Sequence, residues 1–205
     1  MIKNHRLSAG EIKLTGRIRR ELCADAAYRL LLRQNPRSIY TLAHFDMRKI
    51  DPGCGIKLDS ISNYERVTGE TMQDVKLGTT LISSYGRVIL YNTDASGGAR
   101  RLNWTLAHEV GHALLCHADG SRLCEVEADL FASELLLPEP AVRALDMLFE
   151  RPLEPELLTA WFNVSLSAAK RRRAELNRAM YVPTPSGEAL RAALFPADVF
   201  NINYL

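Results

Sequence analysis

The pattern of apolar and polar residues predicts an amphipathic helix over residues 17–33. Apolar side chains recur there at helical spacing, and arginines fill the opposite side. The apolar positions are Leu22, Ala26, Ala27, Leu30 and Leu31. Because proline has no backbone N–H and restricts the residue before it, Asn35-Pro36 should end this helix.

Two runs in the middle of the chain are typical of β-strands. TTLISSY (79–85) and RVILYN (87–92) are rich in β-branched residues and are separated by Gly86. They predict a hairpin, or two adjacent strands of a small antiparallel sheet. Before them, residues 59–68 predict a short helix that Asp59 or Ser60 caps and Gly69 ends.

The second half of the chain is predicted to be almost entirely helical. One helix should begin near Asn103, a residue type favoured at N-caps, and end near His117 because Asp119-Gly120 follows. The next should run from about 123 to 137. Weaker helical patterns cover about 140–150, 154–162 and 165–180. The fold class expected is therefore α+β and mostly helical, with a small antiparallel sheet beside the helix that contains residues 108–112.

Length and composition fit a globular protein built around one domain. The chain has 205 residues, of which 47% are hydrophobic and 24% charged, so it can bury a substantial core. We predict a domain over residues 1–180 and a C-terminal tail over 181–205, after the break at Pro183 and Pro185. The net charge of +2 argues against a dedicated nucleic-acid binder.

Targeting signals and metal-binding cysteines are not predicted. The N-terminus lacks the apolar core of a secretory signal, and no apolar run approaches the roughly 18 residues of a membrane span, so we expect a cytoplasmic location and no membrane contact. The four cysteines show no CxxC spacing, which disfavours a cysteine zinc site.

Residues 108–112 read HEVGH, within the helix expected to begin near Asn103. Positions i and i+4 of a helix lie on one face one turn apart, so His108 and His112 can both reach a zinc ion. Glu109 lies about 100° around the axis, where it can act as a base toward water. Because such a pattern also arises by chance, a third ligand is needed to complete a catalytic zinc site.

The helix over 123–137 should supply that ligand, because the short loop before it makes the two helices antiparallel neighbours. Glu125 and Glu127 are about 200° apart around its axis, so only one of them can face the metal. Small alanines beside Glu125 permit close approach, whereas Phe131 on the face of Glu127 would hold a neighbour away. Glu125 is therefore the predicted third ligand, and Glu127 is the alternative.

Asp129 lies one helical turn after Glu125 and should share its face. A histidine that binds zinc usually donates its second ring N–H to a carboxylate or carbonyl. We therefore predict that Asp129 accepts a hydrogen bond from a ligating histidine. The residue that would stabilise an oxyanion is left open between His117 and a tyrosine such as Tyr91.

The run WTLAHEVGHALLCH, followed by EVEADLFASELLLP, resembles the ImmA/IrrE family of metallo-endopeptidases. That family shows an aromatic-Thr-x-Ala-His-Glu-x-Gly-His helix and then Glu-x-x-Ala-Asn/Asp-x-Phe-Ala-x-x-Leu-Leu-x-Pro. The matching residues here are Trp104, Thr105, Ala107, His108, Glu109, Gly111, His112, Glu125, Ala128, Asp129, Phe131, Ala132, Leu135, Leu136 and Pro138. The Glu-x-x-Ala-Asp order is also similar to thermolysin-like proteases, in which that glutamate is the third ligand.

The resemblance implies a zinc-dependent endopeptidase, with Zn²⁺ on His108, His112 and Glu125 and with Glu109 as the catalytic residue. Family members commonly occur in prophages and mobile elements or serve stress responses. They cut a partner protein, usually a helix-turn-helix repressor, and so relieve repression. A protein substrate of that kind is therefore expected, and direct nucleic-acid binding is not.

Two other functions compete with this interpretation. A catalytically quiet protein could bind and sequester a repressor, but such a module would have no need of a base such as Glu109. A DNA-binding factor is the weaker alternative. The basic run KRRRAELNR at 170–178 is interpreted as the solvated face of a helix whose Leu166, Ala169 and Leu176 point inward.

Overall fold

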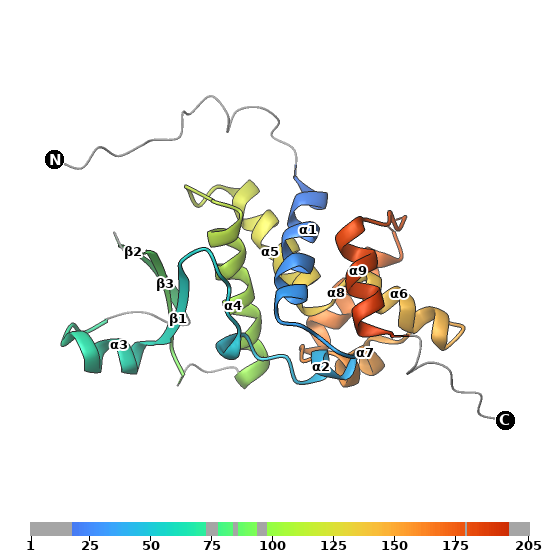
Figure 1. Ribbon diagram of the computed structural model, residues 1–205, viewed down its shortest axis with the longest axis horizontal. Coiled ribbons are helices and arrows are strands. Elements are labelled where there is room, and N and C mark those ends of the chain that lie inside the picture. Colours follow the sequence, from blue (N-terminus) through green and yellow to red (C-terminus); the bar gives the residue numbers. More distant parts are fainter. Residues whose placement is uncertain (1–17, 73–77, 84–85, 94–97, 179, 197–205) are drawn as a thin grey trace.

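The helix α4 (Gly98–Leu114) lies between a small β-sheet and the other large helices (Figure 1). The computed structural model describes residues 18–72, 78–83, 86–93, 98–178 and 180–196. On the side away from the sheet, α5 (Arg122–Leu136) packs against both α4 and α1 (Arg20–Arg33). This architecture confirms the mostly helical α+β class. No helix in the described part of the chain is long and apolar enough to cross a membrane.

The sheet contains three strands in the order β1-β3-β2. As predicted, β2 (Gly78–Ser83) and β3 (Gly86–Tyr91) pair antiparallel. A strand that the pattern did not predict, β1 (Ile56–Ser60), pairs parallel to β3 with Ile56 opposite Arg87. The sheet is therefore mixed rather than wholly antiparallel. Five residues of alternating character were too short a signal, and the partner that fixes β1 lies far along the chain.

The short helix α3 (Ile61–Thr68) follows β1 directly and confirms the helix expected over 59–68. The Ser60 hydroxyl accepts the backbone N–H of Asn63 at 3.1 Å, so Ser60 rather than Asp59 is the cap. Gly69 ends the helix with a φ of 74°, a left-handed conformation that glycine adopts at low cost.

Helix α4 begins five residues before the predicted N-cap, so the prediction for Asn103 was wrong. Asn103 is 3% exposed; its side chain accepts the Met47 N–H at 2.7 Å and donates to the Phe45 carbonyl at 3.1 Å. Because these tertiary partners occupy its amide, Asn103 does not compete with the helix backbone. The helix ends at Leu114, and the left-handed backbone of Cys116 (φ 55°) turns the chain away.

The remaining helices are α2 (Tyr40–Ala43), the 3-10 helix η2 (Met47–Lys49), α6 (Glu139–Leu148), α7 (Pro155–Trp161), α8 (Leu166–Leu176) and α9 (Pro185–Leu194). Of these, α6, α7 and α8 confirm the predictions for 140–150, 154–162 and 165–180, whereas α2, η2 and α9 were not predicted (Figure 1). Helix α9 lies within the predicted tail and packs against α1 and α6. The division of the chain at residue 180 stays a prediction.

The basic run at 170–178 does not form a wholly solvated face, as the sequence had suggested. Arg172 is 3% exposed, pairs with Glu134 of α5 and donates to the Leu137 carbonyl at 3.0 Å. Arg173 is 8% exposed and binds Asp146 of α6 through two contacts of 2.8 Å. The two guanidinium groups therefore tie α8 to α5 and α6, because a buried arginine requires a carboxylate partner.

Helices α4 and α5 approach closely where Gly111 meets Phe131. Phe131 is fully buried, and a Cβ added to Gly111 would lie 2.9 Å from its Cδ1 atom. The expectation that Phe131 would hold a neighbouring helix away was therefore wrong. The missing side chain at Gly111 makes room for the ring, so a bulky and a small residue interdigitate across the interface.

Candidate metal centre

Three predicted ligands come together where α4 faces α5. His108 and His112 project from one face of α4, and their Nε2 atoms are 3.0 Å apart. Glu125, in the first turn of α5, places Oε2 3.3 Å from the Nε2 of His108 and Oε1 3.5 Å from the Nε2 of His112. Among the His, Cys, Asp and Glu side chains of the described ranges, these three form the only group close enough together to hold a metal ion.

The donor set fits zinc. Ligand atoms about 2.0–2.1 Å from a tetrahedral zinc lie roughly 3.3–3.4 Å apart, and the separations here are 3.0, 3.3 and 3.5 Å. Two imidazoles and one carboxylate are also zinc's ordinary catalytic ligands. The Glu125 side chain is 51% exposed, whereas both imidazoles are about one-fifth exposed, so the site opens toward solvent on the side of Glu125.

Asp129 orients His108. Its Oδ1 atom lies 3.0 Å from the Nδ1 of His108, which leaves Nε2 directed at the ligand cluster. Burial opposes protonation of His108, but the hydrogen bond to Asp129 and the nearby carboxylates raise its pKa overall. The same hydrogen bond lowers the pKa of Asp129, so this carboxyl remains ionised.

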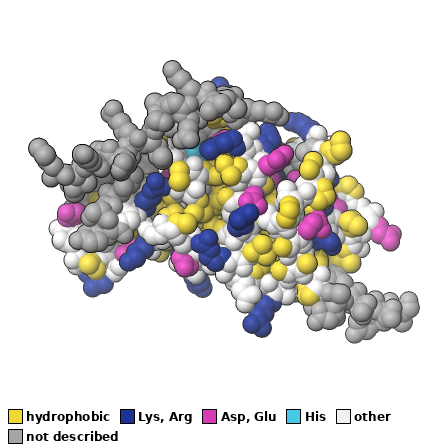
Figure 2. All heavy atoms as spheres, turned by 45° about the horizontal axis from the view of Figure 1, so that its top comes forward, with side chains coloured by type: hydrophobic (Ala, Val, Ile, Leu, Met, Phe, Trp, Pro, Cys, Tyr) yellow, Lys and Arg dark blue, Asp and Glu magenta, His cyan; other side chains and the backbone are white. Residues whose placement is uncertain are grey.

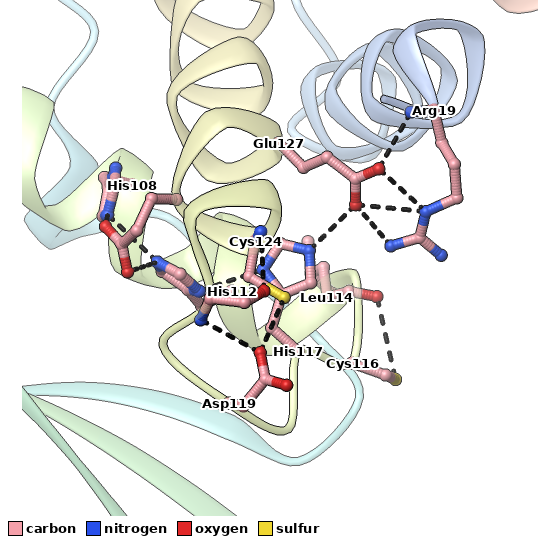
Figure 3. Close-up of polar contacts among 11 residues, drawn as sticks. Arg19, His108, His112, Leu114, Cys116, His117, Asp119, Cys124 and Glu127 are labelled. Atoms are coloured by element: carbon pink, nitrogen blue, oxygen red, sulfur yellow. Dashed lines mark hydrogen bonds and ion pairs between the residues drawn. The ribbon is translucent and has the colours of Figure 1, made fainter. Parts of the chain in front are cut away.

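His112 is held by a chain of buried groups that the sequence pattern did not reveal (Figure 3). Its Nδ1 lies 2.9 Å from the Nδ1 of His117, and the Nε2 of His117 lies 3.1 Å from the Oε2 of Glu127. Glu127 in turn accepts the backbone N–H of Arg19 at 2.8 Å and its Nε–H at 3.0 Å. The side chains of His117 and Glu127 are only 3% and 1% exposed.

This chain of contacts determines where the ring protons lie. Ionised Glu127 can only accept, so the Nε2 of His117 donates to it, and the Nδ1 of His117 can accept from His112 when His117 carries its single proton on Nε2. His112 then carries its proton on Nδ1 and presents the lone pair of Nε2 to a metal. Burial, followed by the neighbouring His108 ring, lowers the pKa of His112 and favours this neutral form.

Arg19 is the main cause of the ionisation of Glu127. Its hydrogen bonds hold the pKa of Glu127 at about 2, although burial of the carboxyl acts in the opposite direction. Glu127, the alternative third ligand, is thus engaged by Arg19 and His117 rather than placed with the two ligating imidazoles. The geometry supports Glu125 as the third ligand.

Glu109 lies beside the ligands and faces the sheet. The hydroxyl of Thr80 on β2 donates to its Oε2 at 3.1 Å. Both residues line a cavity of about 310 Å³ that also contains the ligand cluster and Arg87. Arg87 donates to the Ala113 carbonyl at 2.6 Å, which leaves its guanidinium at the edge of this cavity. The Glu109 carboxylate therefore faces the same cavity as the three ligands.

Two residues considered for oxyanion stabilisation are not placed for that role. Both ring nitrogens of His117 are engaged, by His112 and by Glu127. Tyr91 does not line the cavity of the ligand cluster. Cys116, which follows the motif, is exposed because the left-handed turn after α4 directs it outward.

The contacts around the site that sequence reasoning missed involve Thr80, Arg87 and Arg19, together with the pairing of His117 and Glu127. Arg19 and Glu127 are 108 positions apart, so no local spacing connects them. A usable signal was present only for His117, which lies five residues after His112 and therefore close to it at the helix end.

Comparison with known proteins identifies the family. The family model described as the IrrE N-terminal-like domain, a peptidase family, matches residues 66–173, which is just over half of the chain. The match includes both metal helices and ends within α8. No curated protein and no solved structure matches the chain. From the family match and the ligand geometry, the chain belongs to the IrrE N-terminal-like family of metallopeptidases.

Proposed function

We propose that this chain is a zinc-dependent endopeptidase in which His108, His112 and Glu125 bind the metal and Glu109 is the catalytic base. The observation that carries the proposal is the triangle of ligand atoms at 3.0–3.5 Å, which matches a tetrahedral zinc with one position open. Membership of a metallopeptidase family supports it independently.

The protein's own groups have distinct tasks in this reaction. When bound, zinc supplies a Lewis acid for the peptide carbonyl and for water. Glu109 accepts a proton from the attacking water and returns it to the departing amine, so no net proton is consumed at the carboxylate. The hydroxyl of Thr80 holds Glu109 in orientation, while Asp129 and His117 hold the two imidazoles.

The edge of the sheet supports a polypeptide substrate. β2 is an outer strand of the sheet, and Thr80 brings it to the ligand cavity. An extended peptide that pairs with this edge would lie along the metal centre. The family resemblance favours a helix-turn-helix repressor as that substrate. Because a repressor acts where the DNA is, we propose that the reaction takes place in the cytoplasm.

The competing functions have less support. Thr80 orients Glu109, and a protein that only sequesters a repressor has no use for an oriented base. For a DNA-binding factor, Arg172 and Arg173 are unavailable because both are buried in ion pairs. On the face drawn in Figure 2, basic side chains are scattered among acidic and apolar ones instead of forming one continuous stripe.

The decisive experiment uses Glu109→Gln, with Glu156→Gln as a matched control on the exposed surface of α7. The substrate is the helix-turn-helix repressor encoded nearest to the gene. We expect about one zinc per chain in all three proteins. Cleavage should fall by at least about 10²-fold in Glu109→Gln only. If the Glu109→Gln protein releases the repressor from its operator while the repressor stays uncleaved, sequestration is established instead.

A further inference from the structure

A second cavity, of about 530 Å³, adjoins the metal centre between the N-terminal half of α4 and the start of α8. It is larger than the cavity that contains the ligands. Its lining residues are Arg100, Arg101, Trp104, Val164, Ser165, Leu166, Ser167, Ala168 and Arg171. We call this cavity the arginine pocket.

The charged residues that line the arginine pocket, within the described part of the chain, are all arginines. They are Arg100, Arg101 and Arg171. Arg101 is already engaged in an interaction within the protein, so Arg100 and Arg171 are the groups offered to a ligand. All three arginines are exposed, unlike the buried Arg172 and Arg173 that follow on α8. Guanidinium groups that converge on one concave surface favour a carboxylate or another anion, to which they donate in pairs.

An apolar wall gives the pocket shape as well as charge. Trp104 is half-buried, and the guanidinium of Arg171 lies 5.8 Å from the centre of its ring. This cation–π contact holds Arg171 over the ring while its N–H groups remain able to donate. The aliphatic part of an acidic side chain can therefore pack on Trp104 while its carboxylate meets the arginines.

The pocket and the metal centre share one face of α4. Trp104 precedes His108 by one helical turn, so their side chains project in nearly the same direction. Asp129 connects the two sites: its Oδ1 lies 3.0 Å from the Nδ1 of His108, and the same carboxylate interacts with Arg171 and Trp104 of the pocket. A ligand in the pocket would thus lie directly beside a substrate at the metal.

Helix geometry sets the distance between the two sites. The four residues of α4 from Trp104 to His108 correspond to a rise of about 6 Å, and Arg100 lies one further turn, about another 6 Å, before Trp104. An extended peptide advances about 3.3 Å per residue, so these distances correspond to two to four residues. One substrate peptide could therefore place its cleaved bond at the metal centre and a nearby side chain in the pocket.

We propose that the arginine pocket is a substrate-binding subsite for an aspartate or glutamate located two to four residues from the cleaved bond. The proposal rests on the endopeptidase function above and names a feature of its substrate. The group recognised is the ligand's carboxylate, held by Arg100 and Arg171 against Trp104. Specificity would then come from the pocket, while the metal centre acts on any peptide bond presented to it.

The test measures binding separately from cleavage. Fluorescein-labelled ten-residue peptides, identical except for one Glu or Gln moved through successive positions, are titrated into the zinc-loaded Glu109→Gln protein. Fluorescence anisotropy should show the Glu peptide binding about five- to tenfold more tightly than its Gln counterpart at the favoured position, and less so at high salt. The wild-type protein is assayed with the same peptides to locate the cleaved bond.

Two charge reversals assign any preference to the pocket. Arg171→Glu should abolish the preference for Glu over Gln, whereas Lys170→Glu, an equal charge change on an exposed neighbour outside the pocket, should retain it. Arg100→Gln, on α4 rather than α8, should weaken the preference about two- to fivefold. Zinc content and melting temperature check that each variant remains folded and loaded.

Each outcome decides a separate point. If Glu and Gln peptides bind equally, or neither binds, the subsite proposal fails even if the wild-type protein cleaves. Charge-selective binding that Arg171→Glu removes, without cleavage by the wild-type protein, supports the subsite and refutes the endopeptidase function. If a 20-base-pair DNA duplex displaces the peptides and binds more tightly than any of them, the pocket is a phosphate-binding surface instead.

Discussion

Replacing Glu127 with glutamine should destabilise the protein through the loss of one buried charge. The carboxylate is 1% exposed and accepts hydrogen bonds from His117 and from three N–H groups of Arg19: its backbone N–H, its Nε–H and one terminal NH₂. Glutamine keeps the shape but replaces one acceptor oxygen with a donating NH₂ group. At least one buried donor then has no acceptor, and Arg19 loses its counter-charge.

The lowered pKa of Glu127 sets the magnitude. The pKa is about 2 in the folded protein, against an ordinary value of 4.5. A difference of one pKa unit corresponds to about 1.4 kcal/mol, so the shift corresponds to roughly 3 kcal/mol. Arg19 is 45% exposed and water screens part of the attraction, so we expect Glu127→Gln to lower the free energy of unfolding by about 2–3 kcal/mol at pH 7.

The pH dependence has a definite sign. Because the folded pKa lies below the unfolded one, the stabilisation is complete above about pH 4.5 and disappears as the pH falls toward 2. Urea unfolding of both proteins in EDTA, between pH 7 and pH 2.5, measures this difference without a contribution from metal. Glu188→Gln, which removes an exposed pair with Arg191, is the control and should cost less than about 1 kcal/mol.

The refuting result would be a difference between wild type and Glu127→Gln that is the same at pH 7 and pH 2.5, or no larger than that of Glu188→Gln. A second readout tests the connection to the metal centre. Glu127 orients His117, which orients His112, so zinc affinity of Glu127→Gln should fall by roughly tenfold in a chelator competition. The control should bind zinc as the wild type does.

Three further predictions concern packing, metal affinity and thiol chemistry. Gly111→Ala should lower the free energy of unfolding by about 1–2 kcal/mol, because the clash of its Cβ with Phe131 outweighs the gain in helix propensity. In the double variant, Phe131→Leu should relieve part of this cost. If urea unfolding shows that the effects of the two substitutions simply add, the close contact is contradicted. Asp129→Asn should weaken zinc binding about 10–100-fold in chelator competition, and an unchanged affinity would exclude its role at His108. Burial raises the pKa of the Cys23 thiol to about 12, above its ordinary value of 9.0. The folded protein therefore favours the neutral thiol, which contributes fully to stability below about pH 9. This contribution is lost as the pH rises toward 12. At pH 8 a thiol reagent should label exposed Cys54 within minutes but Cys23 only in urea; equal labelling rates would show that Cys23 is accessible.

Local spacing was sufficient to predict that α4 brings His108 and His112 together. His108 and His112 are four residues apart, and any helix brings such residues to one face. The rotation of about 200° between Glu125 and Glu127 correctly indicated that only one of them can lie with the imidazoles. Glu125, the predicted third ligand, lies with the two imidazoles, as expected. The steric reason for excluding Glu127 was wrong. Phe131, on the face said to repel α4, packs directly against it.

The sequence by itself determined elements whose cause lies within a few residues: most of the helices, the end of α3 at Gly69, and the spacing of His108 and His112. Only the tertiary structure decided which side chains are buried and with what partner. Glu127 and Arg19 illustrate the reason. A charged group becomes part of the interior only when an opposite charge compensates its desolvation, and here that charge comes from 108 positions away.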